Sequence, residues 1–185
     1  MKSPSPKVKL IAAILYREEP IFQRALSQLE EAFSATDHIS SPVPFTFTDY
    51  YQAEMGGNLF RKLVAFSELV NPASLVDAKW KSSGIEKALS VSGNRQVNLD
   101  MGYLDLFKLV LASFKERGNK LYLERGVWGD TTLFYQNGAF QSFDWSFPDF
   151  KSGVFDTDLL TIRSTLKQQL KSGEDNPGHA PHPSN

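Results

Sequence analysis

The sequence predicts an α+β domain with a ferredoxin-like split βαβ core (βαββαβ), followed by a C-terminal β-hairpin extension and a final helix. An apolar run over residues 8–16 is typical of a strand that is buried on both faces. Two segments with helical signals, residues 18–33 and 71–89, alternate with strand-like segments in the order strand, helix, strand, strand, helix, strand. The pair Asn137-Gly138 indicates a two-residue hairpin, because a type I′ turn needs positive φ at both positions.

Local signals indicate the first helix. Glu18 and Glu19 suit the positive end of a helix dipole, and Pro20 suits a first turn. The following apolar residues recur on one stripe, namely Ile21, Phe22, Ala25, Leu26, Leu29, Ala32 and Phe33.

The next elements are predicted from alternation and capping. Alternating Phe and Thr predict a second strand over residues 45–48, and the neighbouring prolines place it at a sheet edge. Residues 59–66 are predicted as the third strand, and residues 97–100 as the fourth. Between these two strands, Asn71 is predicted to cap the second helix, which has proline in its first turn.

The second half of the chain is predicted to be rich in strands. Residues 104–114 fit a helical stripe, which we favour, but Leu109 to Leu111 could equally form a buried strand. Asp156 is predicted to start the final helix. Three further strands are predicted over residues 121–124, 131–135 and 139–143.

Length and composition predict one cytoplasmic domain. A chain of 185 residues with 41% hydrophobic content can bury one core, predicted over residues 8–171. Residues 1–7 and 172–185 are rich in Pro, Ser and charge and are predicted to be disordered tails. The net charge of −1 favours neither nucleic acid nor an anionic membrane as a partner, and no apolar run is long enough to span a bilayer. The oligomeric state cannot be predicted from these features.

Several kinds of chemistry are excluded or disfavoured. Without cysteine the chain cannot form disulfides, thiolate metal sites or a cysteine nucleophile. Of the three histidines, His38 stands alone in a predicted turn, while His179 and His182 lie in the predicted tail. We therefore expect no haem, Fe–S cluster or structural zinc. Neither a P-loop nor a GxGxxG motif occurs, which excludes those two motif-defined nucleotide sites.

Two polar clusters are predicted to meet at one end of the sheet. The loop between the second and third strands contributes Asp49, Tyr50, Tyr51 and Glu54, and the fourth strand contributes Asn98, Asp100 and Tyr103. A turn adds Arg125 and Asp130, which flank two glycines and a tryptophan. Ordinary structural roles for these residues, such as capping and surface ion pairing, remain the alternative.

Three functions are compatible with these residues. We favour a binding or regulatory module for a polar or anionic small molecule, such as a nucleotide. The second is a hydrolase or transferase in which Asp49, Glu54 and Asp100 hold Mg²⁺ or Mn²⁺ and Arg125 or Lys79 neutralises a phosphorylated substrate. The third is a protein-interaction domain whose exposed aromatic residues form a partner patch. The sequence does not decide whether the protein is an enzyme.

Several of these segments resemble a bacterial family known as domain of unknown function 4416. The matching segments run in order from Lys9 to Phe150 and read KLIAAILY, FTDYYQAEMG, RQVNLDMGYL, KLVLAS, KLYLERGVWGDTTL and WSFPDF. Met101 stands where the family pattern has proline before Gly102, which loosens a turn without removing a polar group. The resemblance implies no established activity, substrate or catalytic residue.

Overall fold

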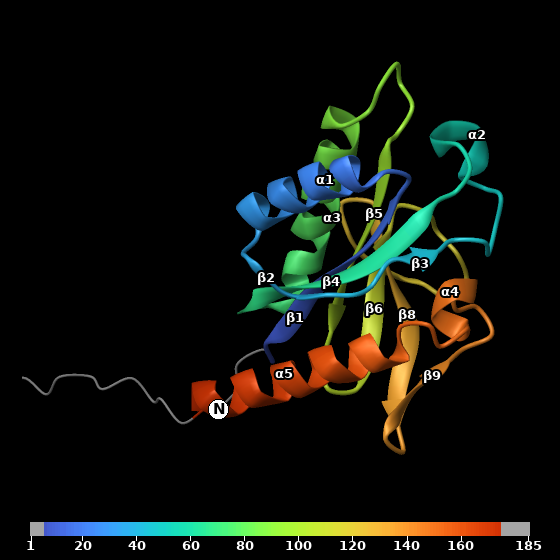
Figure 1. Ribbon diagram of the computed structural model, residues 1–185. Helices are drawn as coiled ribbons and strands as arrows, with labels where there is room; N and C mark the ends of the chain where they lie inside the picture. Colours follow the sequence, from blue (N-terminus) through green and yellow to red (C-terminus); the bar gives the residue numbers. More distant parts are fainter. Residues whose placement is uncertain (1–5, 175–185) are drawn as a thin grey trace, which may run out of the picture.

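The protein is an α+β domain built on one large antiparallel sheet (Figure 1), seen in a computed structural model that describes residues 6–174. The strands are β1 (Val8–Tyr16), β2 (Thr36–Ile39), β3 (Val43–Pro44), β4 (Phe60–Val70), β5 (Val97–Leu104), β6 (Lys108–Ser113), β7 (Leu121–Glu124), β8 (Val127–Gln136) and β9 (Ala139–Ser142). The helices are α1 (Glu19–Ala32), α2 (Gln52–Met55), α3 (Leu75–Ala88), α4 (Pro148–Lys151) and α5 (Asp156–Glu174), and a 3₁₀ turn spans Pro72–Ser74.

The sheet has nine strands in the order β2-β4-β1-β5-β6-β8-β7, with β3 paired to β4 and β9 paired to β8. Every residue of β1 is buried, because β1 lies between β4 and β5 and is covered on both faces. This confirms the strand that the apolar run predicts.

Helices cover the two faces of the sheet unequally. Leu10, Ala12 and Ile14 of β1 pack against α1 and α3, whereas Ile11 and Ala13 pack against α5. In Figure 1, α5 begins near α4 and β8 and runs across the strands away from them, so it covers only part of its face. The remainder of that face is free to carry polar side chains.

The helices predicted over residues 18–33, over residues 71–89 and from Asp156 are confirmed with small shifts at their ends, and so is the hairpin. The Asn71 side chain accepts a hydrogen bond from the Ala73 amide at 2.9 Å, as a cap does. Asn137 and Gly138 have φ values of 52° and 86° and join β8 to β9.

The helix favoured for residues 104–114 is wrong, because this segment turns and returns as β6. The Asp105 carboxylate accepts hydrogen bonds from the Phe107 and Lys108 amides, both at 2.7 Å, and so fixes the turn. Leu109 and Leu111 face the α5 side and Val110 faces the α3 side, so the apolar run is a strand covered on both faces.

The strand predicted over residues 45–48 is also wrong. The edge pairing with β4 is made earlier, by the short strands β2 and β3. Phe45 and Phe47 instead pack against each other with ring centroids 5.7 Å apart in the loop that leads to α2. The prolines do mark a sheet edge, because Pro44 pairs with Phe60 at the edge of β4.

The ends of the domain differ slightly from the prediction. Helix α5 continues to Glu174, beyond the predicted boundary at residue 171. Residues 1–5 and 175–185, which include most of both predicted tails, lie outside the described residues. Within residues 6–174, no helix is long and apolar enough to cross a membrane.

Candidate functional site

Polar residues gather on the sheet face that α5 leaves uncovered. Arg61 on β4 and Asn98 on β5 both lie opposite Leu15 of β1, and Asp100 lies opposite Ala13, so the three side chains share one face. Loops from α2 and α4 lie over this face (Figure 1). We call the hydrogen-bonded group the polar cluster, and it consists of Glu54, Arg61, Arg95, Asn98, Asp100 and Asp149.

Arg61 is the most buried cation of the cluster. Its side chain is 4% exposed, and its two terminal nitrogens donate to Asp149 at 2.5 Å and to Asp100 at 3.1 Å. The Asp149 side chain is itself only 2% exposed. The Arg61 guanidinium group also lies 4.6 Å from the ring centre of Phe45, while its Nε has no hydrogen-bond partner in residues 6–174. Two carboxylates therefore hold this cation inside the protein.

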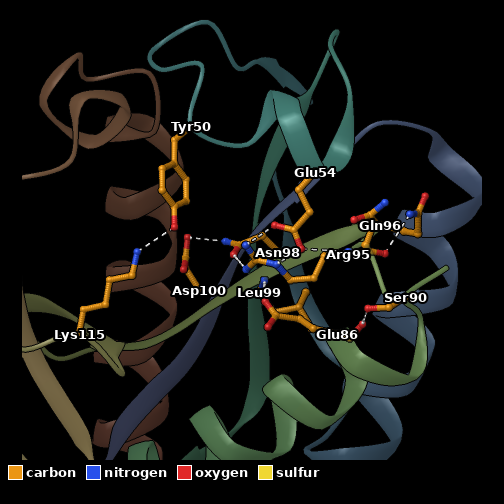
Figure 2. A network of polar contacts seen from close by, with 11 residues as sticks. Tyr50, Glu54, Glu86, Ser90, Arg95, Gln96, Asn98, Leu99, Asp100 and Lys115 are labelled. Atoms are coloured by element: carbon orange, nitrogen blue, oxygen red, sulfur yellow. Dashed lines mark hydrogen bonds and ion pairs between the residues drawn. The ribbon is translucent and has the colours of Figure 1, made fainter. Parts of the chain in front are cut away.

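A chain of hydrogen bonds connects α2 to β5 (Figure 2). The Glu54 carboxylate accepts hydrogen bonds from Arg95 Nε at 2.8 Å and Nη2 at 2.7 Å, a bidentate pair. Arg95 Nη1 donates to Asn98, and Asn98 donates to Asp100 at 3.0 Å. The two sequence segments that were predicted to converge, around Glu54 and around Asp100, are thus joined through Arg95 and Asn98.

A further ion pair, between Asp130 on β8 and Lys120 just before β7, lies next to the cluster. The carboxylate of Asp130 lies 3.8 Å from the Lys120 amine, and both side chains are nearly buried. Burial raises the pKa of Asp130 and lowers the pKa of Lys120, with Lys115 lowering the latter further. Lys120 also donates to Ser113 at 2.9 Å. The Asp100 charge lies near enough to oppose the lowering of the Lys120 pKa, so this pair lies close to Asp100.

Tyr50 and Lys115 meet at the solvent side of the cluster. They point toward one another from two different loops (Figure 2), and Lys115 Nζ donates to the Tyr50 hydroxyl at 2.9 Å. This hydrogen bond from the ammonium group lowers the pKa of Tyr50 below its ordinary value. No acidic side chain within residues 6–174 pairs with Lys115, so its charge is open to an anion.

Asp100 is accessible although it lies near the middle of the sheet. Its side chain is 28% exposed. Both its hydrogen bonds, from Arg61 and Asn98, use Oδ2, and Oδ1 has no partner in residues 6–174. Half-buried Tyr51 lies near enough for the Asp100 charge to act on it. Burial is the larger cause and the Asp100 charge the smaller one that together raise the pKa of Tyr51 to about 12. Asp100 can therefore accept a hydrogen bond from a ligand.

Two predicted site residues, Arg125 and Tyr103, lie elsewhere, and Asp49 has no contact with the polar cluster among residues 6–174. Arg125 forms an exposed ion pair with Asp77, and Tyr103 packs with Val110 on the α3 side of the sheet. Asp49 accepts a hydrogen bond from Gln52 within its own loop. Lys79, the other predicted phosphate partner, donates to the Leu99 carbonyl from α3.

The carboxylates predicted as metal ligands are held by basic or amide groups. Glu54 is paired with Arg95, and Asp100 is paired with Arg61. Within residues 6–174 the structure has no group of three or more His, Asp or Glu side chains placed to hold a metal ion. In this structure Glu54 and Asp100 therefore take part in ion pairs.

The sequence contained signals for the residues that the prediction missed. Arg61 and Lys62 lie inside an apolar strand, and cations are seldom buried without a partner. Asp149 lies in the WSFPDF segment, between Pro148 and Phe150, where an acidic residue among aromatic ones is a signal of the same kind. What local patterns cannot supply is the partner, because Arg61 and Asp149 are 88 residues apart in the chain.

A cavity of about 240 Å³ lies between α1, β4 and α3, away from the polar cluster. Its floor includes Leu10, Phe33 and Phe66, and none of the predicted site residues lines it. The candidate site therefore rests on the polar cluster and its exposed side, not on this cavity.

The sequence model of the family described as "Domain of unknown function (DUF4416)" matches residues 6–165, which is most of the chain. The chain belongs to this family. The match contains every residue of the polar cluster as well as Tyr50, Lys115 and the Asp130–Lys120 pair. No curated protein and no solved structure matches the chain. The DUF4416 assignment confirms the resemblance and carries no activity with it.

Glu86 supports β5 from the other face, and this yields a pH prediction. Its carboxylate, on α3, accepts the Leu99 amide hydrogen bond at 2.5 Å (Figure 2). Burial raises the pKa of Glu86 above its ordinary value, although the Leu99 hydrogen bond and Lys79 oppose the shift. A raised folded-state pKa means that the stability contributed by this carboxyl is fully present below its unfolded-state pKa and is lost as pH rises through the folded-state value.

We therefore expect Glu86→Gln to become more stable relative to wild type as pH rises from about 4 to about 8, because glutamine keeps an acceptor for Leu99 but cannot ionise. Urea unfolding at several pH values measures the difference. A difference that stays constant across this range, or that falls with pH, would contradict the assignment.

Proposed function

We propose that this protein binds a small polar molecule that carries an anionic group, with a nucleotide as the model ligand, at the exposed side of the polar cluster. The observation that carries the proposal is Asp100, whose Oδ1 is accessible and has no partner among residues 6–174, although its Oδ2 is held by Arg61 and Asn98. A carboxylate fixed in this way accepts hydrogen bonds from ligand hydroxyl or amino groups without having to reorganise.

The positive charge of Lys115, near Asp100, supports an anionic ligand. Lys115 has no acidic partner in the described part of the chain and is held beside the site by Tyr50. Tyr50 is 62% exposed, so its ring can stack on a planar group. In this arrangement the Lys115 ammonium group contacts a phosphate or carboxylate of the ligand. Asp100 accepts a hydrogen bond from a ligand hydroxyl group, as acidic residues do from ribose, and Tyr50 contacts a base.

As part of the same proposal, the segment from β1 to β5 is a ferredoxin-like core. Its support is the strand order β2-β4-β1-β5 with antiparallel neighbours, and the packing of both α1 and α3 on one face. Strands β6 to β9 then extend that core. The cytoplasmic location stays a prediction from composition.

Thermal unfolding with separate additions of ATP, GTP, citrate and inorganic phosphate tests the proposal. A ligand at about 100 times its Kd should stabilise the domain by about 2.7 kcal/mol, which corresponds to roughly 5 to 10 °C in Tm. The shift should be lost in Lys115→Met and reduced in Asp100→Asn.

Lys167→Met, on the exposed face of α5, is the matched control and should keep the full shift. The proposal fails if none of these probes changes the Tm. It also fails if the shift survives Lys115→Met undiminished, because the ligand would then bind elsewhere.

A further inference from the structure

The pairing of β1 with β4 is irregular beside the cavity between α1, β4 and α3. Leu10 of β1 alone lies opposite residues 66–68 of β4, because the register of the two strands shifts there. Bulges of this kind re-aim side chains and are common next to active sites. Leu10, Phe66 and Glu68 all line the cavity, so the bulge contributes side chains from both strands to it.

Hydrogen bonds from two other segments hold the bulge in place. The Ser67 amide donates to the Ala35 carbonyl at 2.8 Å, and the Gln169 side chain donates to the Ser67 carbonyl at 2.7 Å. The Glu68 amide donates to the Ser34 hydroxyl at 3.2 Å. Because these backbone groups are satisfied, the bulge is a fixed feature of the fold.

The walls of the cavity are mostly apolar. Leu10, Phe66 and Ala78 are almost fully buried, and the Phe33 ring meets the Phe66 ring edge-on with centroids 5.4 Å apart. An apolar cavity of about 150 Å³ is enough to hold a benzene ring. This cavity measures about 240 Å³ and so has room for a phenyl or isobutyl group together with a small polar head.

Two opposite charges reach the cavity at the C-terminal end of α1. Glu68 reaches it from β4, and Lys81 reaches it from α3, where its Nζ donates to the Ala32 carbonyl at 3.5 Å. Among residues 6–174 neither side chain forms an ion pair, with the other or with any third residue. The third charged residue of the rim, Asp77, is already paired with Arg125. The rim therefore presents one carboxylate and one ammonium group to a ligand.

We propose that this cavity binds an α-amino acid with a large apolar side chain, such as leucine or phenylalanine. Glu68 accepts hydrogen bonds from the α-ammonium group, and Lys81 donates to the α-carboxylate. The Ser74 hydroxyl, which makes no capping hydrogen bond to α3, is a further donor at the same rim. The apolar side chain of the ligand packs against Phe33 and Phe66.

Charge complementarity selects an amino acid over other amphipathic molecules. An apolar amine would pair with Glu68 and leave Lys81 without a partner, and an apolar carboxylic acid would do the reverse. A zwitterion with its two charges on neighbouring atoms satisfies both. No residue of the polar cluster lines this cavity, so the inference does not depend on the proposed function.

Isothermal titration with four probes tests the ligand class. L-Phenylalanine should bind with a Kd on the order of 1 mM or tighter, as expected for a ligand of its size. Phenethylamine, 3-phenylpropionate and glycine each lack one of the three recognised groups and should bind at least about tenfold more weakly.

Two results of this titration would overturn the proposal. The first is the absence of binding by both L-phenylalanine and L-leucine at about 10 mM. The second is binding of phenethylamine or 3-phenylpropionate as tight as that of L-phenylalanine, because the two charges of the rim would then not act together.

Substitutions test the two charged residues. Glu68 and Lys81 are exposed, so Glu68→Gln and Lys81→Met should fold normally and weaken L-phenylalanine binding about tenfold each. In Lys81→Met the preference for L-phenylalanine over phenethylamine should also disappear, which a merely structural role would not cause. Undiminished binding in either variant would overturn the assignment.

Controls on the same chain separate this site from others. Lys87→Met changes an exposed lysine of α3 that does not line the cavity and should leave binding unchanged. Lys115→Met should also keep full L-phenylalanine binding, because Lys115 belongs to the polar site on the other face of the sheet. Loss of binding in either control would place the amino acid elsewhere and overturn the proposal.

Discussion

Arg61→Met is expected to lower the free energy of unfolding by about 3–5 kcal/mol, because it leaves the Asp149 carboxylate buried without its partner. The Asp149 side chain is 2% exposed, so water cannot replace the guanidinium group without local opening. For a domain of this size the loss corresponds to roughly 6 to 20 °C in Tm. Urea unfolding monitored by tryptophan fluorescence measures it.

A double variant separates the charge effect from lost packing. Arg61→Met combined with Asp149→Leu replaces both members of the pair by apolar groups and should recover most of the loss, as paired apolar replacements of buried ion pairs do. Arg125→Met is the control, because the exposed pair with Asp77 is worth no more than about 1 kcal/mol. A loss below about 1 kcal/mol in Arg61→Met would contradict the structural role assigned to this pair.

Gly102→Ala is expected to have an effect of similar size for a steric reason. An added Cβ would lie 2.5 Å from the Val110 carbonyl oxygen and 2.6 Å from Leu111 Cδ2, where β5 and β6 pair. The carbonyl belongs to the backbone of a central strand and cannot move without breaking the ladder. We expect a loss of about 3 kcal/mol or more, at the upper end of the cost of overpacking a core.

Gly84→Ala is the matched control for this substitution. Gly84 lies inside α3, and an added Cβ there meets no atom within 4 Å. Alanine should therefore stabilise the protein by about 0.5–1 kcal/mol through its higher helix propensity. Opposite signs for the two glycines in urea unfolding would support the close approach of β5 and β6. A neutral Gly102→Ala would contradict it.

Prediction from sequence succeeded where a local signal and the tertiary environment agree. The apolar run of β1, the stripe of α1, the cap at Asn71 and the Asn137-Gly138 turn each depend on residues within a few positions of one another. The conformational preference of such a segment is the same before and after folding, so its pattern is sufficient.

Prediction failed where a segment could satisfy two patterns. Residues 104–114 present a helical stripe, but the Asp105 turn and burial of Leu109 to Leu111 between two layers favour a strand. The choice depends on α3 and α5 covering β6 from both sides, and those helices come from distant parts of the chain. The spacing of apolar residues within the segment carries no information about whether helices will pack on both of its faces.

Some features of the candidate site were likewise predictable from the sequence, and others were not. From the sequence alone came the α+β class, the absence of cysteine chemistry, the family motifs and the convergence of Glu54 with Asp100 near one end of the sheet. Only the tertiary structure decided that Arg95 and Asn98 join these two residues, that Arg61 is held by Asp100 and Asp149, and that Arg125 lies elsewhere. The physical reason is that burying a charge requires a partner within a few ångströms, and a sequence records which residues carry charge but not which of them the fold brings that close.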